Sequence, residues 1–94
     1  MTKQFLANIY FLKESEGGRK TDIANKGISF RPMLCYRSNN YHCQLEFDAI
    51  ESIRLGNSYT LKIKIIDTCP VQVSSRFELK EISIIGRGEI VEEL

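Results

Sequence analysis

His42, Cys43 and Asp48 are the residues whose types could support nucleophilic catalysis, with a thiol nucleophile, an imidazole base and a carboxylate that orients the base. His42 and Cys43 are consecutive, however, in a stretch that alternates polar and apolar residues. Consecutive side chains of a strand point to opposite faces, so a contact between nucleophile and base is not available. We therefore expect Cys43 in the core, His42 in solvent, and no enzymatic activity.

The cysteines Cys35, Cys43 and Cys69 are odd in number and lack Cys-x-x-Cys spacing. This pattern fits reduced thiols in a cytoplasmic protein better than a disulfide framework. A structural zinc site needs four well-spaced ligands, which one histidine beside Cys43 does not provide. The sequence also lacks the Gly-x-x-x-x-Gly-Lys-Ser/Thr phosphate cradle. We expect a cytoplasmic protein without a metal, a nucleotide or another cofactor.

A second group of chemically useful residues is basic. Gly17 and Gly18 precede Arg19 and Lys20, and adjacent glycine amides followed by two cations can contact phosphate. The same residues also suit a hairpin turn with a solvated basic exit. We favour the turn, because glycine most often serves where the backbone needs a positive φ.

Further cations are spread along the chain. Arg31 precedes a proline and either contacts a partner or holds the adjacent loop through hydrogen bonds, which we favour. Lys62, Lys64, Lys80 and Arg87 either form one basic face or are solvated separately, and sheet alternation favours the second arrangement. The candidate contacts to a partner or to phosphate are Arg19, Lys20, Arg31, Arg76, Lys80 and Arg87.

Strands must position all of these residues. Apolar, aromatic or alternating stretches typical of strands cover residues 5–12, 33–37, 41–47, 59–66 and 76–80, and a last strand opens at 90–91. Turn residues separate them at 13–18, 38–40 and 86–88, so we expect Gly17, Gly18, Gly86 and Gly88 to be turn glycines. About six or seven short strands, with no helical period, predict an all-β closed sandwich or barrel.

Length and composition limit the class of protein. A chain of 94 residues with 43% hydrophobic and 27% charged residues is typical of one soluble globular domain, here residues 1–94. The formal net charge of +1 lacks the basic excess of a dedicated nucleic-acid binder. No apolar run approaches the ~20 residues of a membrane helix, and the N-terminus has no apolar segment of a cleaved signal peptide.

Five motifs, in order, resemble the C-terminal (third) domain of elongation factor Tu. Residues 13–21 resemble its acidic turn followed by Gly-Gly-Arg, a basic residue and Thr, and residues 30–37 resemble its Tyr-Arg-Pro and aromatic strand ending in Arg. Residues 53–57 stand where the family has an apolar residue, Pro, Gly and Asp or Asn. Residues 76–81 resemble Arg-Phe-Ala-Ile-Arg-Glu, and residues 86–91 resemble the closing Gly-x-Gly strand. The resemblance implies a six-stranded antiparallel closed β-barrel, free-standing and without the factor's GTPase domain.

The resemblance also orders the functional hypotheses. The leading one is a non-enzymatic protein-binding module, since a small barrel fills its interior and leaves its loops and outer face for function. An alternative is a bacterial immunity protein or decoy that neutralises a toxin recognising elongation factor Tu. A second alternative is a tRNA- or ribosome-associated accessory protein, but Ile82-Ser83-Ile84-Ile85 replace the Gly-Gly-Arg of the family's last hairpin, which lies near the T arm of tRNA. The last hypothesis is that the chain is a gene fragment that folds without a dedicated role.

Overall fold

The computed structural model describes residues 3–24, 30–47 and 52–94, and within them the chain is built from strands and one short 3-10 turn. The strands are β1 (Lys3–Phe11), β2 (Ile23–Ala24), β3 (Met33–Tyr36), β4 (Asn39–Glu46), β5 (Ser52–Ile53), β6 (Ser58–Ile65), β7 (Arg76–Lys80) and β8 (Ile84–Glu93). The 3-10 turn, η1, covers Glu14–Glu16.

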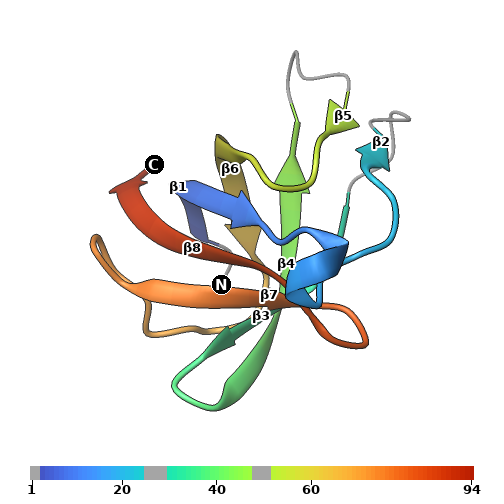
Figure 1. Cartoon of the computed structure of the whole chain (residues 1–94). Helices are drawn as coiled ribbons and strands as arrows, with labels where there is room; N and C mark the ends of the chain where they lie inside the picture. The colour runs from blue at the N-terminus through green and yellow to red at the C-terminus, as the bar shows by residue number, and fades with distance from the viewer. Residues whose placement is uncertain (1–2, 25–29, 48–51) are drawn as a thin grey trace.

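Six of these strands close into an antiparallel barrel in the order β1-β6-β4-β3-β7-β8, with β8 pairing back onto β1 (Figure 1). The predicted six-stranded antiparallel closed barrel is thus confirmed. The short strands β2 and β5 form a separate two-stranded sheet, Ile23 opposite Ile53. Sequence periodicity did not predict this sheet, because two residues are too few to show an alternation.

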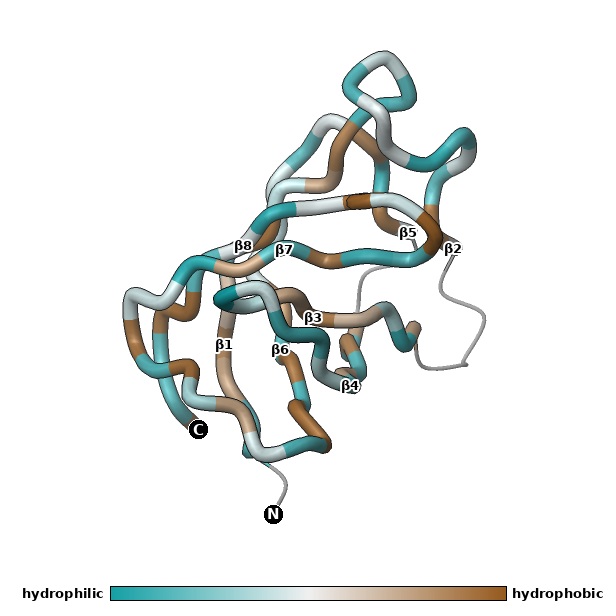
Figure 2. Tube along the Cα trace, turned by 90° about the horizontal axis from the view of Figure 1, so that it is seen from below, coloured by the Kyte–Doolittle hydropathy of each residue, from teal (hydrophilic) through white to brown (hydrophobic). Residues whose placement is uncertain are grey.

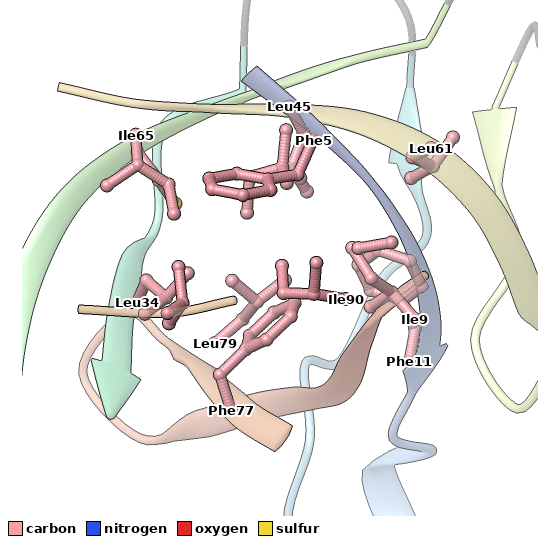
Figure 3. Close-up of a cluster of buried hydrophobic side chains, with 14 of the residues drawn as sticks. Phe5, Ile9, Phe11, Leu34, Leu45, Leu61, Ile65, Phe77, Leu79 and Ile90 are labelled. Atoms are coloured by element: carbon pink, nitrogen blue, oxygen red, sulfur yellow. The ribbon is translucent and has the colours of Figure 1, made fainter. Parts of the chain in front are cut away.

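Alternation along each strand fills the barrel interior. The inward positions of β1 are Phe5, Ala7, Ile9 and Phe11, each 0% exposed. Side chains from every barrel strand converge on the same space in Figure 3, among them those of Leu34, Leu45, Leu61, Ile65, Leu79 and Ile90. Full burial of one such side chain contributes about 1.5–3 kcal/mol relative to exposure. No polar or charged side chain is buried in the part of the chain that the structure describes.

The first connection forms the predicted turn. Gly17 follows η1 with φ 92, the left-handed region that glycine adopts without steric cost, and its N–H bonds the carbonyl of Glu14 at 3.0 Å. Gly18 is needed for space, since a Cβ there would lie 2.4 Å from the carbonyl oxygen of Leu12. Both predicted turn glycines in this region therefore serve the chain reversal.

The prediction for Gly86 and Gly88 was wrong. Both lie inside β8, which begins at Ile84, six residues before the predicted start of the last strand at Ile90. Their lack of a side chain serves packing: a Cβ at Gly86 would lie 3.0 Å from the carbonyl oxygen of Tyr10, and one at Gly88 would lie 2.5 Å from Cζ of Phe77. Glycine within a strand thus marks close approach here rather than a turn.

The hairpin between β3 and β4 turns one residue earlier than predicted. Arg37 and Ser38 are its two central residues, with φ 50 and φ 66, and Tyr36 pairs with Asn39. Positive φ at both central positions is the geometry of a type I′ turn, which matches the twist of the flanking strands. Asn39 and Asn40, predicted as turn residues, belong to β4.

A candidate binding groove on the barrel surface

Strand pairing arranges outward side chains of β3, β7, β8 and β1 in rows across the barrel. One row contains Cys35, Glu78, Arg87 and Tyr10, because Cys35 pairs with Glu78, Glu78 with Arg87, and Arg87 with Tyr10. In the next row Arg76 pairs with Glu89 and Glu89 with Asn8. Figure 2 shows the alternation of hydrophilic and hydrophobic residues along β7 that places these charges outside.

Two adjoining hollows lie between these rows. One, of about 270 Å³, is lined by Cys35, Arg37, Arg76, Glu78 and Arg87 over Phe77 and Gly88. The other, of about 340 Å³, is lined by Asn8, Tyr10, Ser58, Arg76, Arg87, Gly88 and Glu89. Because they share Arg76, Arg87 and Gly88, we describe the two hollows together as the arginine groove.

Several side chains of the arginine groove are tethered. Nε of Arg76 bonds Oε1 of Glu89 at 3.4 Å, although the Arg76 side chain is 87% exposed. The guanidinium carbon of Arg37 lies 5.1 Å from the ring centroid of Tyr36, within cation–π range. Sγ of Cys35 donates to Oδ1 of Asn40 at 2.9 Å. These contacts reduce the number of conformations that must be ordered when a ligand binds.

Arg87 lies beside a tyrosine–carboxylate pair. The hydroxyl of Tyr10 donates to Oε1 of Glu16 at 2.7 Å, and this bond raises the pKa of Tyr10. The backbone N–H of Lys13 and the Tyr10 hydroxyl lower the pKa of Glu16, and the positive charge of Arg87 acts in the same direction. The phenol is therefore held in place at one end of the groove.

The structure separates the six cations predicted as partner or phosphate contacts. Arg76 and Arg87 come together in the arginine groove. Arg19 is engaged within the protein: it lies 3.6 Å from Oε1 of Glu81 and 5.5 Å from the ring centroid of Phe30. A side chain held by an ion pair and a ring is better explained as a structural contact than as a phosphate ligand.

The other three candidates lie away from the groove lining. Lys20 is exposed after the first turn, and Lys80 is half-buried on β7 between Met33 and Ile84. Arg31 is exposed just before β3, and the loop it was expected to hold, residues 25–29, lies outside the described residues.

The single basic face that we considered does not form. Lys62 and Lys64 lie on β6, whereas Lys80 lies on β7, three strands away in either direction around the barrel. Nζ of Lys62 is instead 3.6 Å from Oε2 of Glu46 on the adjacent β4. The favoured expectation of separate, outward-facing lysines agrees with this topology, although Lys62 is paired with Glu46 rather than fully solvated.

Arg37 and Tyr10 are lining residues that the sequence reasoning did not select. Arg37 was treated as the end of a strand, and Tyr10 as part of an apolar strand. One signal was available: in the predicted strand 33–37, Arg37 follows Cys35 by two residues, which would put both on one face. Its position beside Arg76, however, depends on the register of β3 against β7, which the sequence pattern does not specify.

The set His42, Cys43 and Asp48 forms no described catalytic arrangement. Cys43 is 1% exposed, its Sγ donates to the carbonyl of Pro32 at 3.2 Å, and burial raises its pKa to about 12. The His42 side chain is 69% exposed and its Nδ1 lies 2.8 Å from Oδ2 of Asp67. The expected opposite orientations of His42 and Cys43 are confirmed, while Asp48 lies outside the described residues.

Within residues 3–24, 30–47 and 52–94 there is no group of three or more His, Cys, Asp or Glu side chains that could hold a metal ion. The same residues contain no helix long and apolar enough to cross a membrane.

Apolar side chains also reach the surface at one hairpin. Ile82 is 99% exposed at the connection between β7 and β8, and Ile84, which begins β8, is 36% exposed. These residues stand in the hairpin whose sequence departs from the motif of the resembled domain. They offer an apolar contact close to Lys80 and Glu81.

The comparison with protein families agrees with the barrel and with the order of its motifs. A family model described as the elongation factor Tu C-terminal domain matches residues 1–93. The match extends over nearly the whole chain and includes all five motifs. This chain belongs to the family of elongation factor Tu C-terminal domains.

Proposed function

We propose that this protein is a non-enzymatic binding module that engages a protein partner through the outer face of its barrel. The arginine groove is the observation that carries this proposal, because it brings Arg37, Arg76 and Arg87 around two adjoining hollows. Arginine is enriched at protein interfaces, where its planar guanidinium makes several directed hydrogen bonds. Membership of the elongation factor Tu C-terminal domain family supports a cytoplasmic location.

The absence of an enzymatic role is part of the proposal. The domain of elongation factor Tu that this chain resembles is non-catalytic. The thiol of Cys43 faces the core with a pKa of about 12, which is unsuitable for a nucleophile at neutral pH. His42 and Asp67 form an exposed pair, and Cys69 lies in the same hollow as Asp67. The Cys69 thiol is buried and burial raises its pKa, so it is a poor nucleophile at neutral pH.

The mixed charge of the arginine groove favours a protein over RNA. Its lining includes Glu78 and Glu89 as well as the three arginines. A phosphate backbone offers acceptors and negative charge, so both glutamates would repel it. A peptide offers backbone N–H donors as well as acceptors, and therefore has partners for both signs of charge.

A tRNA- or ribosome-associated role is the second candidate, and the three arginines are the observation that favours it. Domains of this family bind both proteins and tRNA in translation. If RNA were the partner, binding would weaken steeply with salt as counterions replace the arginine contacts. Identification of the captured molecule as protein or tRNA separates the two candidates.

A narrower form of the proposal is an immunity or decoy protein. A barrel resembling one domain of elongation factor Tu would present the same kind of surface to a toxin that recognises that factor. The resemblance supports this role only as a special case of protein binding. Protection of cells against such a toxin by expression of this chain is the direct measurement.

The proposed function is tested by capture from a native cytoplasmic extract, with bound protein and RNA both identified after low-salt and high-salt washes. The matched variants are R76E/R87E in the groove and K20E/R31E outside it, which change the net charge equally. We expect one defined protein to be captured by the wild type and by K20E/R31E, and to be lost from R76E/R87E. Recovery of tRNA that washes off with salt would instead support the RNA role.

A further inference from the structure

We infer that the arginine groove binds an extended, acidic peptide segment whose carboxylates lie between the arginines. This inference rests on the proposed function and specifies the chemistry of the partner. The groove residues come from β3, β7, β8, β1 and β6, which are consecutive around the barrel. The hollows therefore run across the strands rather than along one of them.

The dimensions fit a short extended segment. Five neighbouring strands span four gaps of about 4.8 Å, which gives a path of roughly 19 Å along the curved surface of the barrel. An extended peptide advances about 3.3 Å per residue, so about six residues cover this length. Because the barrel is closed, a peptide has no free edge of the main sheet to pair with, and side chains must provide recognition.

The donors in the groove suit carboxylates. Each guanidinium has five N–H donors, and the contact of Arg76 with Glu89 uses its Nε at a long 3.4 Å. Arg37 is placed by its ring contact with Tyr36, and Arg87 lies opposite both Glu78 and Tyr10. A planar carboxylate can accept two parallel bonds from an arginine, which is the strongest form of this contact.

The glutamates of the groove favour a peptide with spaced rather than continuous acids. Glu78 and Glu89 alternate with Arg87 and Arg76 in the two rows. A peptide with acids at alternate positions can direct its carboxylates toward arginines while its backbone N–H groups meet the glutamates. A nucleic-acid strand has no peptide N–H groups between its charges to place beside the glutamates.

The probe is a peptide of about six residues that alternates Glu and Ser. The controls are the same peptide with Gln in place of Glu, and a uridine oligonucleotide of equal length. Binding is followed by NMR on 15N-labelled protein, through the arginine Nε–Hε and backbone amide signals. We expect saturable shifts at Arg76 and Arg87 with the Glu peptide and none with the Gln peptide.

Variants test whether the groove itself is responsible. R76E/R87E should weaken the Glu peptide by at least about tenfold, the size of one lost charge-assisted hydrogen bond. K20E/R31E has the same charge change outside the groove and should stay within about twofold of the wild type. The milder R76Q/R87Q should also lose binding, and far-UV circular dichroism checks that each variant is folded.

Three outcomes would overturn the inference: equal loss with K20E/R31E, shifts that map outside the groove, or tighter binding of the uridine oligonucleotide at the same salt concentration. The first would mean that net charge alone attracts the peptide. If a captured protein partner depends on Arg76 and Arg87 but the Glu peptide does not bind, the proposed function stands and the acidic-segment inference fails.

Discussion

Replacement of Gly88 by alanine tests whether the floor of the arginine groove and the core are packed as described. Gly88 lies on β8 opposite Phe77, and a Cβ there would lie 2.5 Å from Cζ and 2.8 Å from Cε2 of the Phe77 ring, and 3.1 Å from Cγ1 of Ile9. Ordinary carbon contacts are about 3.5–4.0 Å. Phe77 is 3% exposed and Ile9 is fully buried, so the ring has little room to move.

The magnitude follows from two opposing effects. Overpacking a core typically costs about 1–3 kcal/mol. Where the backbone conformation suits alanine, replacing glycine by alanine stabilises the folded protein by about 0.4–1 kcal/mol, because the unfolded chain has less conformational entropy to lose. We expect Gly88→Ala to lower the free energy of unfolding by about 1–2 kcal/mol, the net of these effects. In a chain of this length, each kcal/mol corresponds to a shift in Tm of roughly 4–8 °C.

The assay is urea unfolding followed by far-UV circular dichroism and tyrosine fluorescence, since the chain has four Tyr and no Trp. Phe77→Leu removes the ring atoms nearest the new methyl group, so Gly88→Ala should be neutral or stabilising in that background. Gly17→Ala is the control, because Gly17 has φ 92 but no atom within 4 Å of its Cβ position. The destabilisation caused by Gly17→Ala should be the same whether position 77 carries Phe or Leu. Additive effects of Gly88→Ala and Phe77→Leu would refute the reasoning.

Three further predictions concern the turn, one ion pair and the cysteines. Ser38→Gly should raise the free energy of unfolding by about 0.5–1 kcal/mol in urea titrations, because Ser38 has φ 66 and glycine adopts positive φ without strain. Hydrogen bonds from the backbone N–H of His42, and then from its ring, lower the pKa of Asp67. The difference in unfolding free energy between the wild type and Asp67→Asn should therefore be full at neutral pH and shrink as the pH falls from about 4 through the lowered pKa. A difference that does not change with pH would contradict this assignment. A thiol reagent monitored by mass spectrometry should modify half-exposed Cys35 in the native protein, whereas Cys43, with a pKa of about 12 and 1% exposure, should react only on unfolding.

Local patterns were sufficient where a strand is long and has one buried face. The alternation of Leu61, Ile63 and Ile65 with Lys62 and Lys64 predicted β6 within a residue at each end. The same pattern predicted the opposite orientations of His42 and Cys43. Such positions can be predicted because burial of one face fixes the direction of every side chain along the strand.

Local patterns were misleading where glycine has a packing role. Glycines such as Gly86 and Gly88 are typical of a turn. In β8, however, glycine is required because a Cβ would collide with the Tyr10 carbonyl or the Phe77 ring. The two-residue strands β2 and β5 gave no periodic signal, and their partners are distant in sequence. These features depend on contacts that one segment alone does not contain.

The sequence by itself determined the all-β class, the family resemblance and the inward positions of the long strands, because these follow from residue type and a period of two. The tertiary structure alone decided which cations share a surface. Barrel closure placed β6 opposite β7 and so separated Lys62 and Lys64 from Lys80. The register of β3, β7 and β8 brought Arg37, Arg76 and Arg87 around one groove, since side chains on different strands become neighbours only through hydrogen-bonded pairing.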